Sequence, residues 1–71
     1  MKENIYKKIE IVGSSRDSLE KAVRNALQKA SESIRNLRWF EVTEIRGTME
    51  DTTEPFWQVT VKIGFTVEES L

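Results

Sequence analysis

The segment RNLRWFEVTEIRG, residues 35–47, decides the fold, because a helical pattern ends there and a strand begins. Before this segment, apolar residues recur every three or four positions, which is the spacing of one helix face. From Trp39 to Thr48 the residues suit a strand. We therefore expect a helix that ends, turns and leads directly into a strand whose first residue is a tryptophan.

The helix is predicted to follow a turn at Gly13-Ser14-Ser15. Asp17 and Glu20 have the spacing of a capping box, and Ser15 is an alternative N-cap. The apolar residues that follow form one continuous stripe along the predicted helix. Its extent predicts about five turns and a length of about 30 Å. Because a short three-stranded sheet is narrower than that, either the sheet curls around the helix or part of the stripe meets a neighbouring subunit. The apolar stripe comprises Leu19, Ala22, Val23, Ala26, Leu27, Ala30, Ile34 and Leu37.

Two further strands are predicted, one over Ile5–Val12 and one over Phe56–Val67. The second has the clearest core face, made by alternate apolar residues from Trp57 to Phe65. The polar stretch Gly47–Pro55 suits a hairpin connection, and we expect the tail Glu68–Leu71 to be frayed. The element order is therefore β-α-β-β. It predicts an α+β fold in which the third strand lies centrally in an antiparallel sheet and the single helix covers one face.

Length and composition exclude several classes of protein. Seventy-one residues make one domain, residues 1–71, with so small a core that we expect a homo-oligomer. The absence of cysteine and histidine excludes disulfides and the common zinc sites. The 11 basic and 12 acidic residues give a net charge of −1, which is not typical of nucleic-acid binding. No apolar run suits a membrane span or a signal peptide, so a cytoplasmic location is expected.

The face opposite the helix carries the candidate ligand site. Trp39 and Gln58 lie on neighbouring strands there, and a flat ring with a bidentate amide suits a flat heteroaromatic ligand. Phe56 is expected to lie near Trp39 and to form an exposed aromatic patch with it. The less specific interpretation is that Trp39 packs in a core or interface and that Gln58 is solvated. Trp57 is assigned to the core or to a subunit contact.

Other polar residues suggest chemistry only weakly. Without histidine, cysteine or a phosphate-binding loop, we expect no enzymatic activity. Arg46, which has acidic neighbours in the sequence, suits a solvated ion pair. The acidic residues near the hairpin suit solubility better than a divalent cation site. They are Glu41, Glu44, Glu50, Asp51 and Glu54.

Three segments resemble the dodecin family and together cover nearly the whole chain. They are YKKIEIVGSS (residues 6–15), IRNLRWFEVTEIRG (residues 34–47) and WQVTVKIGF (residues 57–65). The resemblance implies a β-α-β-β subunit whose sheet wraps one long helix. It also implies that twelve subunits form a hollow homododecamer.

The resemblance further implies a flavin site for riboflavin, FMN or FAD. Two flavin rings would stack between two symmetry-related copies of Trp39, and Gln58 would bond the pyrimidine edge of the ring. Arg46 would lie beside the flavin. The implied role is flavin storage, buffering and photoprotection. Two alternatives stay open: a hollow shell that binds cations on interior carboxylates without flavin, and an enzyme that uses a bound flavin.

Some positions do not follow this pattern. Arg38 stands where many dodecins have Asp, and Thr66 stands where a basic residue is frequent, so the choice among flavins stays open. Strict alternation along the strand also places Arg46 on the face opposite Trp39. A bulge near Gly47 would remove that conflict, and so would a contact across a subunit boundary.

Overall fold

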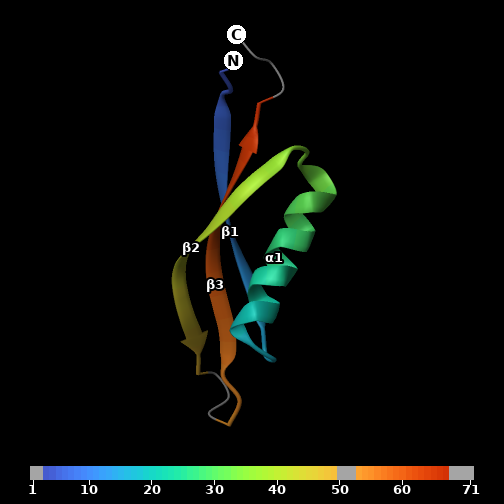
Figure 1. Ribbon diagram of the computed structural model, residues 1–71. Coiled ribbons are helices and arrows are strands. Elements are labelled where there is room, and N and C mark those ends of the chain that lie inside the picture. Colours follow the sequence, from blue (N-terminus) through green and yellow to red (C-terminus); the bar gives the residue numbers. More distant parts are fainter. Residues whose placement is uncertain (1–2, 50–52, 68–71) are drawn as a thin grey trace.

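A computed structural model describes residues 3–49 and 53–67 of the chain. The elements follow in the order β1 (Tyr6–Ser15), α1 (Leu19–Ser33), β2 (Leu37–Thr48) and β3 (Phe56–Thr66). Strand β3 lies between β1 and β2 and runs antiparallel to both. Figure 1 shows α1 along one face of this sheet. The predicted α+β fold with β-α-β-β order is therefore confirmed.

The core lies between α1 and the central strand. Three helix alanines (Ala22, Ala26 and Ala30) are buried against Val59, Val61 and Ile63 of β3. Small side chains on the helix let its backbone approach the sheet closely, so the β-branched side chains of β3 fill the space between them. The predicted apolar face of β3 is thus confirmed at its centre.

The predicted turn at Gly13-Ser14-Ser15 is wrong, because these three residues continue β1 and pair with residues 57–59 of β3. Gly13 serves a different purpose from the one expected. A Cβ atom placed there would lie 2.0 Å from the carbonyl oxygen of Ala22. The glycine therefore lets the strand pass directly beneath the helix.

Both predicted ends of the helix also need correction. Ser18 is the N-cap, and its hydroxyl accepts a hydrogen bond from the Lys21 backbone N–H at 3.0 Å. The hydroxyl of Ser15 instead accepts from the backbone N–H of Asp17 at 2.9 Å, so neither of the predicted caps is the N-cap.

At the other end, the helix stops after 15 residues, a length of about 22 Å, rather than continuing to Leu37. Ile34 is already extended, and Asn36 has a φ of 63°, in the left-handed region that asparagine tolerates better than most residues. Leu37 still packs against the core, but it does so from β2. For Leu37, the apolar pattern was therefore interpreted correctly as core and wrongly as helix, whereas the stripe from Leu19 to Ala30 is helical as predicted.

Strand β2 contains two irregularities that determine which side chains share a face. The pairing with β3 shifts between Leu37 and Trp39 and again between Val42 and Glu44. The second shift leaves Thr43 as an additional residue, which reverses the alternation of side chains after it. Arg46 therefore pairs with Gln58 and lies on the same face as Trp39. The conflict in the sequence is removed by a bulge, located at Thr43 rather than near Gly47.

Some predictions lie outside the described residues. They concern the tail Glu68–Leu71 and residues 50–52 of the connection between β2 and β3. Within the described residues, no helix is both long and apolar enough to cross a membrane. The assignment of residues 1–71 to one domain stays a prediction.

Candidate functional site

The outer face of the sheet, opposite α1, presents the Trp39 indole in a fixed position. A Cβ atom at Gly64 would lie 2.3 Å from the ring, so only a glycine leaves room for the indole to lie against β3. The ring of Tyr6 meets the indole edge-on, with centroids 5.2 Å apart and planes at 67°. Trp39 nevertheless remains 38% exposed. The indole is therefore held against the sheet and flanked by Tyr6, and it keeps an accessible surface on which a flat ring can stack.

Arg46 and Gln58 form the second feature of the outer face, and this one is polar. Nε of Arg46 donates a hydrogen bond to Oε1 of Gln58 at 2.8 Å, and the two residues are direct cross-strand partners. Because Oε1 is occupied, the amide NH₂ of Gln58 and the terminal nitrogens of Arg46 remain as donors. This pair is suited to a ligand edge that carries carbonyl oxygens.

The two features do not meet within one chain. Trp39 pairs with Gly64, and Arg46 pairs with Gln58, six residues earlier on β3. At about 3.3 Å per residue the separation along the strand is about 20 Å. The residues share a face and lie on neighbouring strands, as predicted, yet one ring stacked on Trp39 cannot reach Gln58 of the same chain.

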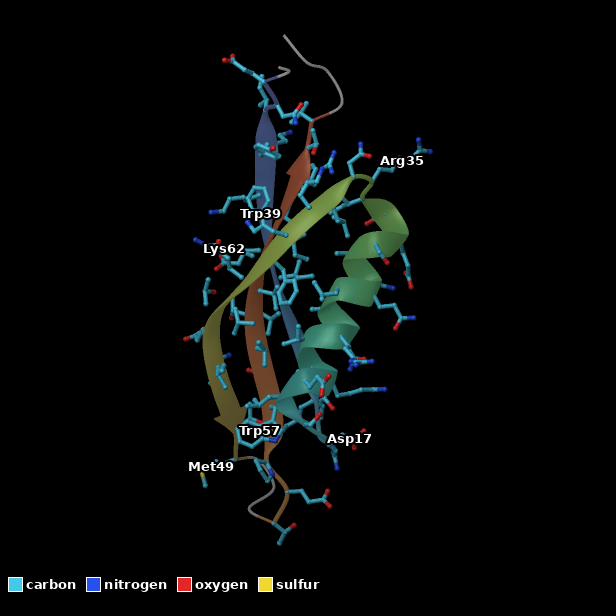
Figure 2. The ribbon with its side chains drawn as sticks, in the orientation of Figure 1. Asp17, Arg35, Trp39, Met49, Trp57 and Lys62 are labelled. Carbon is cyan, nitrogen blue, oxygen red and sulfur yellow. The ribbon has the colours of Figure 1, made fainter. Side chains whose placement is uncertain are left out.

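The predicted aromatic patch of Trp39 and Phe56 is wrong. Strands β2 and β3 are antiparallel, so their first residues lie at opposite ends of the sheet. Phe56 is half-buried, with the guanidinium of Arg16 5.3 Å from its ring centroid. Trp57 is half-buried near the same end, and Figure 2 shows it far from Trp39. Trp39 is therefore the tryptophan available for stacking.

Among the carboxylates considered for a cation site, each one that the structure describes contacts a different partner. Glu41 forms an ion pair with Lys8 at 3.6 Å, and Glu44 accepts a hydrogen bond from the Thr60 hydroxyl at 3.2 Å. Within residues 3–49 and 53–67, no group of three acidic side chains could hold a metal ion. The remaining members of the set are Glu54, which lies 3.8 Å from Arg16, and Glu50 and Asp51, which are outside the described residues.

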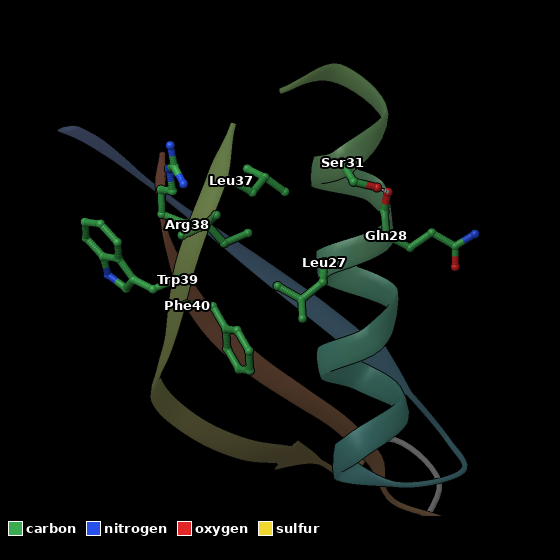
Figure 3. A pocket seen from close by; sticks show the side chains of 8 residues that line it. Leu27, Gln28, Ser31, Leu37, Arg38, Trp39 and Phe40 are labelled. Atoms are coloured by element: carbon green, nitrogen blue, oxygen red, sulfur yellow. Dashed lines mark hydrogen bonds between the residues drawn. The ribbon is translucent and has the colours of Figure 1, made fainter. Parts of the chain in front are cut away.

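A groove of about 400 Å³ lies on the other side of β2, between that strand and α1. Figure 3 shows Leu27, Leu37 and Phe40 directed into it, whereas Trp39 points away from the helix. Phe40 is exposed, and so are Val42 and Ile45 further along the strand. Helix α1 packs mainly on β1 and β3, so this side of β2 remains an apolar strip, defined here by Phe40, Val42 and Ile45. Our sequence analysis did not identify this strip, although its residues follow the strand period once the bulge is included.

The fold defines a small α+β protein with an exposed indole on the outer face of its sheet. Residues 5–68 match the sequence profile of the family described as Dodecin, and the chain belongs to that family. It is 46% identical to the dodecin of Thermus thermophilus over 66 residues, which is 93% of this chain and 96% of that protein. Members of this family are binding proteins rather than enzymes.

Solved structures agree with this assignment. The dodecin of Streptomyces coelicolor superposes with a TM-score of 0.90 at 48% identity, over 99% of this chain and 100% of that one. A more distant structure is a calcium dodecin of Mycobacterium tuberculosis, described as calcium-chelating with a novel calcium-binding site. It has a TM-score of 0.81 at 27% identity and covers 94% of this chain and 96% of that one.

Proposed function

We propose that this chain binds a flavin, namely riboflavin, FMN or FAD, by stacking its ring on Trp39. The observation that carries the proposal is the position of the indole. It is held by Gly64 and Tyr6, yet it keeps an accessible surface on the outer face of the sheet. A rigid, half-exposed aromatic ring is a suitable stacking partner for a flat heteroaromatic ligand.

Each flavin site is proposed to need two copies of the chain. Trp39 and Gln58 of one chain are separated by six positions of β3, so a second copy must supply the polar contact. A two-fold axis between the copies creates two equivalent sites. Each copy then contributes its indole to one flavin ring and its Arg46–Gln58 pair to the other flavin ring. This arrangement supports two flavins stacked between two copies of Trp39.

The arrangement favours storage and photoprotection. Two indoles and two flavin rings make three stacked contacts, each worth about 0.5–1.5 kcal/mol beyond the burial of apolar area. A ring enclosed on both faces leaves little space for a substrate. An indole in contact with an excited flavin can quench it by electron transfer. We therefore infer that the protein sequesters flavin and does not use it in turnover.

The apolar strip of β2 supports assembly into a homododecamer. Phe40, Val42 and Ile45 are all exposed on this side of β2, and Phe40 lines the groove together with Leu27. A surface of this kind on so small a domain is typical of a subunit contact. The outer face and the apolar strip lie on opposite sides of β2, so one copy can make both contacts simultaneously.

A fluorescence titration of riboflavin or FMN with flavin-stripped protein tests the proposal. We expect quenching that saturates near one flavin per chain. Two matched variants identify the indole responsible. Trp39→Phe should weaken both binding and quenching, whereas Trp57→Phe should leave both near the wild-type level. Flavin that stays fluorescent at micromolar protein, or equal loss in both variants, would contradict the assignment.

A hollow shell that binds cations without flavin is the second candidate, favoured by the calcium dodecin among the matched structures. In this chain such a site would need carboxylates from more than one copy, because the described part of a single chain contains no acidic cluster. A calcium-dependent rise in the unfolding temperature of the oligomer, together with unquenched flavin, would favour this candidate.

A further inference from the structure

Arg38 lies beside the stacking surface of Trp39 and is held there by the sheet. It is the additional residue where the pairing shifts between Leu37 and Trp39. Its Nε donates a hydrogen bond to Oγ1 of Thr66 at 2.7 Å. Thr66 lies on β3 two residues beyond Gly64, against which the indole packs. The guanidinium is thus tied to β3 two residues beyond the glycine against which the indole packs, although Arg38 itself stays exposed.

The positive charge of Arg38 is not neutralised by the described part of the chain. The ion pairs found among residues 3–49 and 53–67 do not include Arg38, Lys7 or Arg35. Lys7 and Arg35 line a hollow of about 330 Å³ together with Thr66. Further along the outer face, by contrast, Lys8 is paired with Glu41. Strand alternation places Lys7, between Tyr6 and Lys8, on the other face of the sheet. Arg38 is therefore the cation without an ion-pair partner, among the described residues, that adjoins the Trp39 end of the outer face.

The chemistry of the guanidinium identifies what this end of the site would bind. Only the Nε–H of Arg38 is used in the bond to Thr66, so the terminal NH₂ groups remain as donors. Two such groups bind phosphate oxygens in a bidentate, charge-assisted way. The hydrogen bond to Thr66 limits the freedom of the side chain before binding and so reduces the entropic cost of recognition.

We propose that Arg38, positioned by Thr66, recognises the phosphate of a flavin whose ring stacks on Trp39. The chain then selects FMN over riboflavin, because the two ligands differ only in that phosphate. This inference rests on the proposed flavin function and adds the residues that determine its ligand. A charge-assisted hydrogen bond supports a preference of about tenfold or more.

The test compares the affinities of FMN and riboflavin in the assembled protein by fluorescence quenching. We expect the wild type to bind FMN about tenfold more tightly or better, with a preference that decreases as salt is added. Arg38→Gln should bring the ratio of the two affinities close to one while leaving riboflavin binding unchanged. Thr66→Val keeps the charge and removes only the positioning bond, so the ratio should decrease in part.

Arg35→Gln is the matched control, since it removes an equal charge at the same end of the sheet from a residue that does not bond Thr66. It should retain the wild-type preference. Equal affinity for both flavins in the wild type would overturn the proposal. A ratio unchanged in Arg38→Gln, or reduced equally in Arg35→Gln, would also overturn it. If riboflavin and FMN both stay unquenched, the flavin function itself fails, which is a different result from equal binding of the two.

Discussion

Replacing Gly64 with alanine would add one methyl group directly beneath the Trp39 indole. The new Cβ would lie 2.3 Å from Cε2 and Cζ2 of the ring, whereas ordinary contact begins at 3.4 Å. The indole must therefore move outward by about 1 Å, which also disturbs its contact with Tyr6. Overpacking of this kind costs about 1–3 kcal/mol. We expect the lower part of that range, because the ring is half-exposed and can yield.

The effect on ligand binding should be larger than the effect on folding. In the proposed two-copy site, a displaced indole would no longer offer a stacking surface at the position where the second copy would present its Arg46–Gln58 pair. We expect flavin affinity to fall by about tenfold or more, which corresponds to at least about 1.4 kcal/mol. Denaturant unfolding of Gly64→Ala measures the free energy of unfolding, and flavin quenching measures the affinity.

Gly47→Ala is the matched control for this variant. Its Cβ would lie 3.6 Å from the ring of Trp57, which is an ordinary contact. No described glycine has a positive φ, so alanine fits the backbone at this position. We expect a change in stability below about 1 kcal/mol and wild-type flavin binding. If Gly64→Ala binds flavin as tightly as the wild type, the contact between the indole and β3 does not define the site.

Three further substitutions test the fold and the assembly. Gly13→Ala should lower the free energy of unfolding by at least about 1–3 kcal/mol, because its Cβ would lie 2.0 Å from the backbone oxygen of Ala22. Ser18→Ala removes the N-cap bond to the Lys21 N–H and should cost about 1 kcal/mol in urea unfolding. Ile45→Lys places a charge on the apolar strip. It should dissociate the oligomer into folded smaller species, as measured by sedimentation.

Each of these expectations has its own contradicting result. Wild-type stability of Gly13→Ala would mean that β1 and α1 separate without cost. Unchanged unfolding of Ser18→Ala would mean that water replaces the cap. An intact oligomer in Ile45→Lys would show that the apolar strip is not a subunit contact.

The fold could be predicted because its main signals are local. Alternation from Trp57 to Phe65 and the alanine-rich stripe of the helix each reveal a buried face without reference to the rest of the chain. The errors arose where distant packing decides the local structure. Gly13 was interpreted as a turn residue, although it is required by the close approach of Ala22. The helix end was misplaced because Leu37 keeps the apolar period after Asn36 has left the helical region.

The candidate site could be predicted only in part. Trp39 and Gln58 were correctly placed on neighbouring strands and on one face. Their separation along the sheet was missed. Trp39 lies far from the β2–β3 hairpin and Gln58 lies close to it, so counting residues from the hairpin along the two antiparallel strands would have indicated the distance. The bulge at Thr43, which brings Arg46 to the same face, has no local signal as clear as a glycine. Its position emerges from the pairing of β2 with β3.

The most direct test of the central claim is a complementation titration with mixed oligomers of Trp39→Ala and Gln58→Ala chains. If each site takes its indole from one copy and its amide from another, a mixed pair contains one site with both residues intact. We then expect FMN quenching to recover in co-assembled protein to a level above that of either variant alone. Quenching that stays at the average of the two separate variants would show that one chain supplies both residues, and would contradict the two-copy site.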